Sequence, residues 1–123
     1  MPETLIKVDL TKSAYENDMI HNRWHPDIPI VAWVNPGDDF IIETYDWTGG
    51  FIKNNDSADD VRDIDLSIVH FLSGPIGVKG AEPGDPLAVE LLEVNPGPVG
   101  AAMIIPGWGQ LIDQVKAPVT RLF

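Results

Sequence analysis

The sequence predicts a mainly β protein, with sandwich or jelly-roll-like sheets and a short helical segment. Three observations lead to this fold class. A Pro-Gly pair precedes an apolar stretch three times, and the stretches that follow have the residue alternation or apolar content of β-strands. The chain also contains 11 Gly and 11 Pro among 123 residues, which exceeds the average combined share of about 12% and favours many turns between short strands.

Each Pro-Gly pair is part of a tripeptide: Asn-Pro-Gly at residues 35–37, Glu-Pro-Gly at 82–84 and Asn-Pro-Gly at 95–97. Pro presets φ near −65° at the second position of a turn, and Gly accepts the positive φ of the third position. Each tripeptide is therefore predicted to form a type II turn. Asp38 and Asp85 follow two of these turns, and we expect their side chains to bond back to the turn backbone. A structural role is favoured over catalysis for both.

Five strands are expected in chain order. Residues 4–10 and 28–34 are short apolar stretches, and residues 40–47 are apolar on both sides, which predicts a central strand covered on both faces. A further short strand is expected around Val78. In residues 86–94, "PLAVELLEV", apolar side chains alternate along one face, as in a half-buried strand.

Residues 57–72, "SADDVRDIDLSIVHFL", combine capping residues at the start with apolar positions at roughly helical spacing. The same stretch also alternates apolar and polar residues, so we expect a short helix that runs into an extended segment. The aspartates near it are interpreted as a solvated face, because no EF-hand spacing is present. These aspartates are Asp56, Asp59, Asp60, Asp63 and Asp65.

Composition restricts the function. The chain has 8 Lys and Arg against 19 Asp and Glu, a formal net charge of −11, which disfavours nucleic acid and anionic membrane surfaces as partners. The absence of Cys excludes disulfides, zinc–thiolate sites and a Cys nucleophile. The start "MPETLIKVDL" does not resemble a signal peptide, and no apolar run approaches the roughly 18 residues of a membrane span. A cytoplasmic location is expected.

Asp46 is the most unusual polar residue, because "IIETYDWTGG" places it at the end of the expected two-sided strand. A carboxylate in such a place needs a hydrogen-bond donor, a cation or a metal. The alternative is that Asp46 caps the turn at residues 48–50. Glu43 lies three residues earlier, on the opposite face of an ideal strand, and would converge with Asp46 only through a bulge or bend.

His21, His25 and Asp27 have spacing that resembles metal ligands on a helix. Two prolines within residues 26–29 argue against a helix, so we favour a loop that packs Trp24 against the core. A metal-binding storage or sensing domain, built from these histidines and the acidic run, remains a weaker alternative.

His70 follows an apolar segment and is interpreted as a hydrogen-bonded core histidine. Ser73 lies in "LSGP" and not in a Gly-x-Ser-x-Gly elbow, so the sequence gives little support for a nucleophilic serine.

Three stretches, "HNRWHPDIP", "PGDDFIIETYDWTGG" and "NDSADDVRDIDLSIVHFLSGPIGVKGAEPGD", resemble the acetamidase/formamidase family. The resemblance is closest to its formamidase branch and covers residues 1–94. It implies hydrolysis of short aliphatic linear amides, formamide and water giving formate and ammonia. It also implies a cytoplasmic homo-oligomer with a small amide as substrate, and neither nucleic acid nor a membrane as partner.

The resemblance also implies site residues. Glu43 and Asp46 fall on the family's Glu-Thr-x-Asp, residues 63 and 65 on its acidic pair, and residues 70–75 on its His-x-Leu-Ser-Gly-Pro. The implied catalytic residues are Asp46, Glu43 and His70, and the implied substrate-binding residues are Trp47 and Ser73. Asp46 would act as base or metal ligand, and His70 as acid or as a loop-positioning residue. No cofactor is certain, and a divalent metal such as zinc is left open, with Asp46 as its best candidate ligand.

Chains of this family run longer than 123 residues. Residues 1–123 are therefore expected to form a single β-rich domain, the N-terminal portion of a longer chain that completes the site. The alternative is a non-catalytic β-scaffold or the partner-dependent half of a split amidase.

Overall fold

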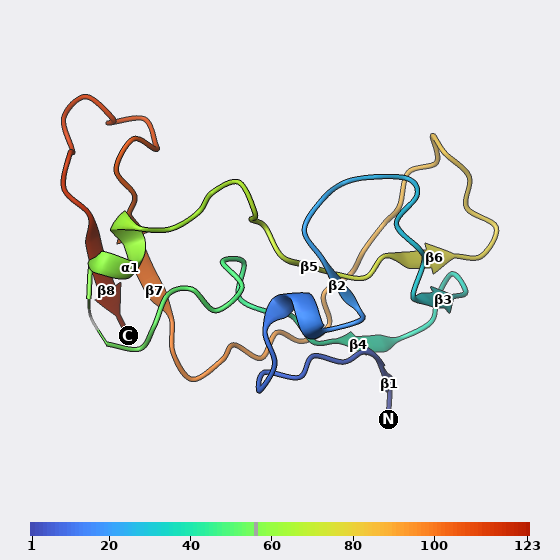
Figure 1. The fold of residues 1–123 in the computed structure, drawn as a ribbon. Helices are drawn as coiled ribbons and strands as arrows, with labels where there is room; N and C mark the ends of the chain where they lie inside the picture. The colour runs from blue at the N-terminus through green and yellow to red at the C-terminus, as the bar shows by residue number, and fades with distance from the viewer. Residues whose placement is uncertain (56) are drawn as a thin grey trace. The chain divides into compact units, whose positions relative to one another are not determined.

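A computed structural model describes residues 1–55 and 57–123, which group into two compact units. The first unit comprises Met1–Gly50 and Ser67–Val89, and the second comprises Phe51–Leu66 and Glu90–Phe123. Figure 1 traces the chain from blue at the N-terminus to red at the C-terminus. Short strands outnumber helices among the described residues, which confirms the predicted mainly β class. The single β-rich domain and the sandwich arrangement stay predictions.

The first unit contains three two-stranded sheets and one 3-10 helix, η1 (Ala14–Glu16). Its strands are β1 (Glu3–Ile6), β2 (Ile20–His21), β3 (Ala32–Val34), β4 (Phe40–Ile42), β5 (Leu72–Ser73) and β6 (Ile76–Val78). β1 pairs with β4 and β3 with β6 in parallel, whereas β2 and β5 are antiparallel. Every pair joins segments far apart in sequence, so the sheets bring residues 70–78 beside the N-terminal third of the chain (Figure 1).

The centre of the first unit is small. Ile6 is fully buried, and Ala14, Val34 and Phe71 are the other buried apolar side chains of this unit. Ile6 lies opposite Ile42 in the β1–β4 pair, and its carbonyl accepts a hydrogen bond from the Glu43 amide at 3.0 Å. The end of β4 is thereby fixed to the end of β1.

Asn17 holds the loop between β1 and β2 in shape. Its side-chain oxygen accepts from the Asp9 amide at 2.8 Å, and its side-chain nitrogen donates to the Asp9 and Ser13 carbonyls at 3.2 and 2.9 Å. Asn17 is buried, and these three bonds satisfy both ends of its amide. The loop therefore closes around one polar side chain.

Two of the three predicted turns are confirmed in detail. Gly37 and Gly84 have φ of 91° and 101°, and Asp38 and Asp85 each donate their amide to the first carbonyl of the turn. The Asp38 carboxylate accepts from the Asn35 amide at 2.7 Å, and that of Asp85 accepts from the Glu82 amide at 2.9 Å. The third turn is different, because Gly97 lacks the positive φ of a type II turn.

The second unit contains α1 (Asp59–Arg62) and the antiparallel pair β7 (Ala101–Ile104) and β8 (Val119–Leu122), which Figure 1 shows side by side. The predicted short helix is confirmed by α1, whereas bends and a turn follow it at residues 63–68 in place of the expected extended segment. Val61 is fully buried and Ile105 nearly so. Beyond the ladder, the amides of Gly100 and Phe123 donate to each other's carbonyl at 2.8 and 3.0 Å.

Two strand predictions are wrong in extent or burial. The strand expected over residues 40–47 ends at Ile42, and Ile41 and Ile42 are exposed rather than covered on both faces. Residues 86–94 form no strand, although their pattern is that of one, because no described segment pairs with them. The other expected strands are present in shortened form as β1, β3 and β6.

No helix in residues 1–55 or 57–123 has the length and apolar content needed to cross a bilayer.

The Asp38 turn gives a prediction for stability against pH. The backbone and side-chain amides of Asn35 donate to the Asp38 carboxylate and hold its pKa below the ordinary value. A folded-state pKa below the unfolded value of about 3.9 stabilises the fold above that pH, and the gain is lost as pH falls through the folded pKa. We expect Asp38→Ala to lower the thermal midpoint at pH 7 and to lower it less at pH 3.

Asp39→Ala is the control, because it removes an equal charge next to the turn and leaves both Asn35 contacts in place. Thermal unfolding followed by circular dichroism at both pH values measures the difference. An Asp38→Ala effect of equal size at pH 3 and pH 7 would contradict the assignment.

Candidate functional site

The predicted site residues lie on two segments of the first unit, residues 43–50 and 70–74, which run beside each other. The Phe71 amide donates to the Trp47 carbonyl at 3.1 Å, and the Ser73 hydroxyl donates to the Glu43 carbonyl at 2.8 Å. These two bonds fix the relative positions of the two segments. The structure thus brings the Glu-Thr-x-Asp and His-x-Leu-Ser-Gly-Pro motifs together.

Phe71 is the packing centre of this arrangement. Its ring is buried and meets Tyr15 edge-on, with ring centroids 5.1 Å apart and an interplanar angle of 85°. The ring also lies over Gly49, where a Cβ atom would come within 2.5 Å of Phe71 Cε2. Gly49 has φ of 74°, so both its backbone conformation and its lack of a side chain are required.

Asp46 organises its own turn, as the structural alternative predicts. Its Oδ2 accepts hydrogen bonds from the Thr48 hydroxyl and, at 3.1 Å, from the Gly50 amide, while its carbonyl accepts from the Gly49 amide at 2.8 Å. Asp46 itself is exposed, so the expected position at the end of a covered strand is wrong. The turn holds the carboxylate in one orientation at the surface of the unit.

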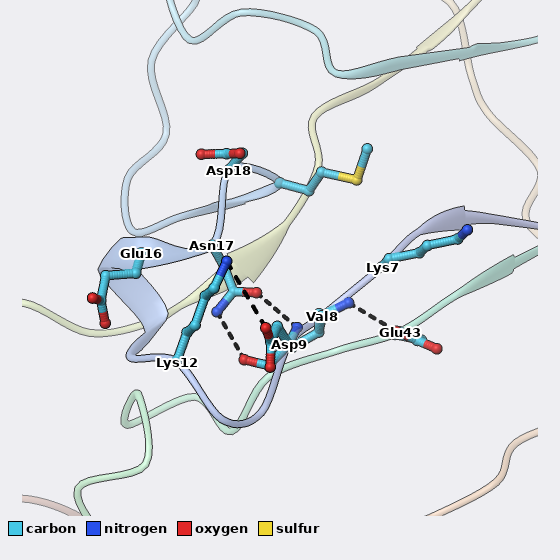
Figure 2. Close-up of a pocket in the computed structure, with 9 residues that line it drawn as sticks. Lys7, Val8, Asp9, Lys12, Glu16, Asn17, Asp18 and Glu43 are labelled. Carbon is cyan, nitrogen blue, oxygen red and sulfur yellow. Dashed lines mark hydrogen bonds and ion pairs between the residues drawn. The ribbon is translucent and has the colours of Figure 1, made fainter.

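The Glu43 carboxylate has a different hydrogen-bond partner from that of Asp46. Its Oε2 accepts from the Val8 amide at 2.7 Å, and Glu43 lines a pocket of about 560 Å³ together with Asp9 and Lys12 (Figure 2). Among the described residues, Glu43 and Asp46 share no hydrogen-bond partner. The pocket is rich in charge, with Lys7, Lys12, Asp9, Glu16, Asp18 and Glu43 on its walls.

His70 stacks on Trp47. The two rings are tilted by 34° with centroids 4.8 Å apart. His70 is exposed, so the interpretation as a core histidine is wrong; its neighbour Phe71 takes the buried position instead. Ser73 lies in β5, and its hydroxyl proton is directed to the Glu43 carbonyl, as described above.

The residues with metal-ligand spacing do not form a cluster. His21 Nδ1 lies 2.8 Å from the Arg23 carbonyl, and His25 Nδ1 lies 3.8 Å from an Asp27 carboxylate oxygen. Within the part of the chain that the structure describes, no three His, Asp or Glu side chains are grouped to hold a metal. Trp24 is 90% exposed, so the expected packing of Trp24 on the core is wrong.

The acidic run belongs to the second unit. Arg62 donates to Asp59 and Asp63 at 2.7 Å each, and the bond from Arg62 holds the pKa of Asp63 below its ordinary value. Asp60 accepts from the Lys53 amide at 2.7 Å. The predicted solvated face therefore includes a local ion-pair network around α1, while Asp56 lies outside the described residues.

Sequence reasoning missed Phe71 and Gly49, the two residues on which the local geometry depends. The Gly pair after Asp46 and the aromatic residue after His70 were visible in the sequence. Their contact spans 22 positions, and periodicity along one chain carries no information about which distant residues meet.

Comparisons with known proteins agree on one family. A model of the acetamidase/formamidase family matches residues 7–116. A formamidase of Methylophilus methylotrophus is 62% identical over 94 residues, 76% of this chain and 23% of that protein. An acetamidase of Mycolicibacterium smegmatis is 53% identical over 111 residues, 89% of this chain and 27% of that protein.

A solved structure, a gamma lactamase from Delftia acidovorans, is 54% identical and superimposes with a TM-score of 0.90. The match covers 98% of this chain and 31% of the gamma lactamase. The chain therefore spans about a quarter of the length of the curated relatives and under a third of this solved structure.

The contact between Gly49 and Phe71 gives a prediction for stability. Gly49→Ala places a residue with a side chain at positive φ, which costs about 1–2 kcal/mol, and drives the new methyl into the Phe71 ring, which costs about 1–3 kcal/mol more. Gly37→Ala is the matched control, because Gly37 has φ of 91° and no atom within 4 Å of the new Cβ position.

Denaturant unfolding of both variants measures the free energy of unfolding. We expect Gly49→Ala to lose more stability than Gly37→Ala, together with a change in the near-ultraviolet signal of the Tyr15–Phe71 pair. Equal losses for the two variants would show that the contact with Phe71 is unimportant.

Proposed function

Because the chain belongs to the acetamidase/formamidase family, we propose that the protein to which it contributes hydrolyses short aliphatic linear amides such as formamide. The observation that supports this most directly is the match to the formamidase of Methylophilus methylotrophus, 62% identical across the segment with both motifs. Water and formamide would give formate and ammonia. We further propose a cytoplasmic homo-oligomer, as the resemblance implies.

Amide hydrolysis requires an activated water, a group that polarises the carbonyl and a proton donor for the leaving nitrogen. The base removes a proton from water as its oxygen attacks the carbonyl carbon. The tetrahedral intermediate then expels the nitrogen, which leaves as ammonia once it is protonated. The proton that the base takes from water is matched by the proton that the leaving nitrogen receives, so the reaction has no net change in protons on the protein.

Asp46 is proposed as the base. Its Oδ2 accepts from Thr48 and Gly50, which fixes the carboxylate plane and leaves Oδ1 as the oxygen that would face a water. A base held by its own turn needs no rearrangement when substrate binds. Glu43 lines the pocket and accepts from the Val8 amide. We propose that its negative charge helps to orient the substrate.

His70 is proposed as the proton donor, and Trp47 and Ser73 as substrate-binding residues. Stacking on Trp47 orients the imidazole, and the exposed position of His70 keeps it accessible to a substrate. The Trp47 ring offers apolar contact to a small amide. The Ser73 oxygen can accept a hydrogen bond from the amide N–H of the substrate while the Ser73 hydroxyl donates to the Glu43 carbonyl.

A divalent metal such as zinc at Asp46 would need further ligands from outside the described residues, which gather no three His, Asp or Glu side chains. The proposed proton transfers use side chains of this chain alone.

One observation favours a second candidate, the partner-dependent half of an amidase. Asp46, Glu43 and His70 are all exposed, and within the described residues they share no hydrogen bond. Catalytic groups usually lie in a cleft from which water is excluded. In this candidate the chain supplies part of the site and a second polypeptide supplies the rest.

The base assignment predicts a selective loss of activity. In a complete family chain that carries this segment, Asp46→Asn should lower kcat for formamide by about 10²–10⁴-fold with little change in KM. The Asn oxygen can still accept from Thr48 and Gly50, so the turn should persist. Asp39→Asn is the control, because it makes the same carboxylate-to-carboxamide change at an exposed position outside the two motifs. Ammonia release measures both, and unchanged hydrolysis by Asp46→Asn would remove Asp46 as base or metal ligand.

The exposure of the site predicts that residues 1–123 alone release no ammonia from formamide or acetamide above the buffer rate. The measurement is an ammonia assay on purified chain, with intact mass and circular dichroism recorded on the same sample. Activity from a single species of the expected mass would instead place all the essential groups within these residues.

A further inference from the structure

A second pocket, of about 300 Å³, lies within the first unit and shares no lining residue with the pocket beside Glu43. Apolar or aromatic side chains form much of its wall, from Tyr15, Ile20, Ile28 and Phe71. Small-molecule sites are typically mostly apolar cavities of about 300–1,000 Å³ with a few polar groups. This pocket is at the lower end of that range, so it suits a small ligand.

The polar wall of the pocket consists of three consecutive residues that follow one another from β2. His21 Nδ1 lies 2.8 Å from the Arg23 carbonyl, and Nδ1 must donate this bond because a carbonyl oxygen can only accept. The Asn22 side-chain nitrogen donates to the Ile68 carbonyl at 2.9 Å. These two bonds hold the chain around Arg23 in one conformation.

Arg23 supplies the charge of the pocket. Among the described residues that line it, Arg23 is the only Lys, Arg, Asp or Glu. Its guanidinium forms no hydrogen bond or ion pair with any of residues 1–55 and 57–123. A guanidinium binds a carboxylate through two parallel N–H···O bonds. A ligand with one carboxylate and an apolar body therefore matches both parts of the wall.

Charge also distinguishes this pocket from the one beside Glu43. Four carboxylates and two lysines line that larger pocket, and the whole chain has a formal net charge of −11. An anionic ligand is repelled by most of such a surface. The pocket at Arg23 has a cation and no lining carboxylate, so an anion is favoured here.

We propose that this pocket binds a short aliphatic monocarboxylate, with the carboxylate at Arg23 and the hydrocarbon part against Ile20, Ile28 and Phe71. A short carboxylate is also the acyl product of the amide hydrolysis proposed above. The inference thus adds a product-binding site, and the identification of this ligand as a product rests on the proposed function.

Phe71 connects the pocket with the two motifs. It lines the pocket, while its amide donates to the Trp47 carbonyl and its ring lies over Gly49. A carboxylate in the pocket would therefore contact the residue that fixes the segments of Asp46 and His70 against each other.

The experiment follows the isoleucine methyl signals by NMR in a complete family chain that carries this segment, at constant ionic strength. We expect butyrate to shift the Ile20 and Ile28 methyl signals in a saturable way and to leave Ile64, in the second unit, unchanged. 2-Pentanone has the same propyl group without the charge, and it should bind at least about tenfold more weakly. Formate lacks the propyl group and should also bind at least about tenfold more weakly, because each buried methylene adds about fourfold in affinity.

Two substitutions test the role of Arg23. Arg23→Gln should weaken butyrate binding at least about tenfold, because it removes the charged donor. Lys79→Gln is the matched control, since it removes a positive charge from an exposed side chain of the same unit outside the pocket. It should change the affinity by less than about twofold, because salt screens a charge outside the pocket. Circular dichroism checks that both variants fold.

Three results would overturn the proposal: no saturable shift of the Ile20 and Ile28 methyl signals, equal affinity for butyrate and 2-pentanone, or equal affinity of Arg23→Gln and Lys79→Gln for butyrate. Binding is measured without turnover, so its outcome is separate from that of the activity assays. Saturable butyrate binding in a protein that releases no ammonia from amides would support the site and contradict the proposed function alone. Ammonia release without a response of these methyl signals would overturn the site alone.

Discussion

The arrangement of the site segments depends on the contact between the Phe71 ring and Gly49. Because Gly49 has no side chain and adopts a positive φ, the ring can lie directly on the backbone of the turn that Asp46 organises. The Phe71 amide then reaches the Trp47 carbonyl. His70 and Ser73 flank Phe71 at one and two residues' distance, so their positions against Trp47 and Glu43 follow from the same contact. One buried aromatic side chain thereby sets the geometry of exposed polar ones.

Few apolar side chains are buried in the described part of the chain, so apolar burial contributes little to this geometry. All four sheets formed by residues 1–55 and 57–123 have two strands, and such pairs are marginal without a third strand or a covering layer. Local hydrogen bonds and ion pairs hold many of the loops instead. The Asn17 amide closes one loop, and the Asp38 and Asp85 carboxylates close two turns. Arg62 forms ion pairs around α1. Such interactions fix loop conformations well, but they add little to the free energy of unfolding when they are exposed to water.

The features that the sequence predicted correctly are local ones. The turns before Asp38 and Asp85 follow from the conformations of Pro and Gly and from side chains within three residues, and the structure has them as expected. Burial was predicted less well. His70 and Trp24 were expected to pack on a core and are exposed, since burial depends on which distant segments are present to cover a residue. Residues 86–94 show the same limit, because alternation predicts the strand and cannot supply its partner.

The same division between local and distant interactions bears on catalysis. The Asp46 turn and the stacking of His70 on Trp47 are complete within this chain, so both side chains are oriented before any further polypeptide is added. Groups that are already ordered cost little conformational entropy when a site is assembled around them. Asp46 and His70 are exposed, whereas charged groups stabilise a transition state most effectively where water is excluded. Burial of exposed apolar side chains such as Ile41 and Ile42 would stabilise the fold, and a cover over the two motifs would also exclude water from their charged groups.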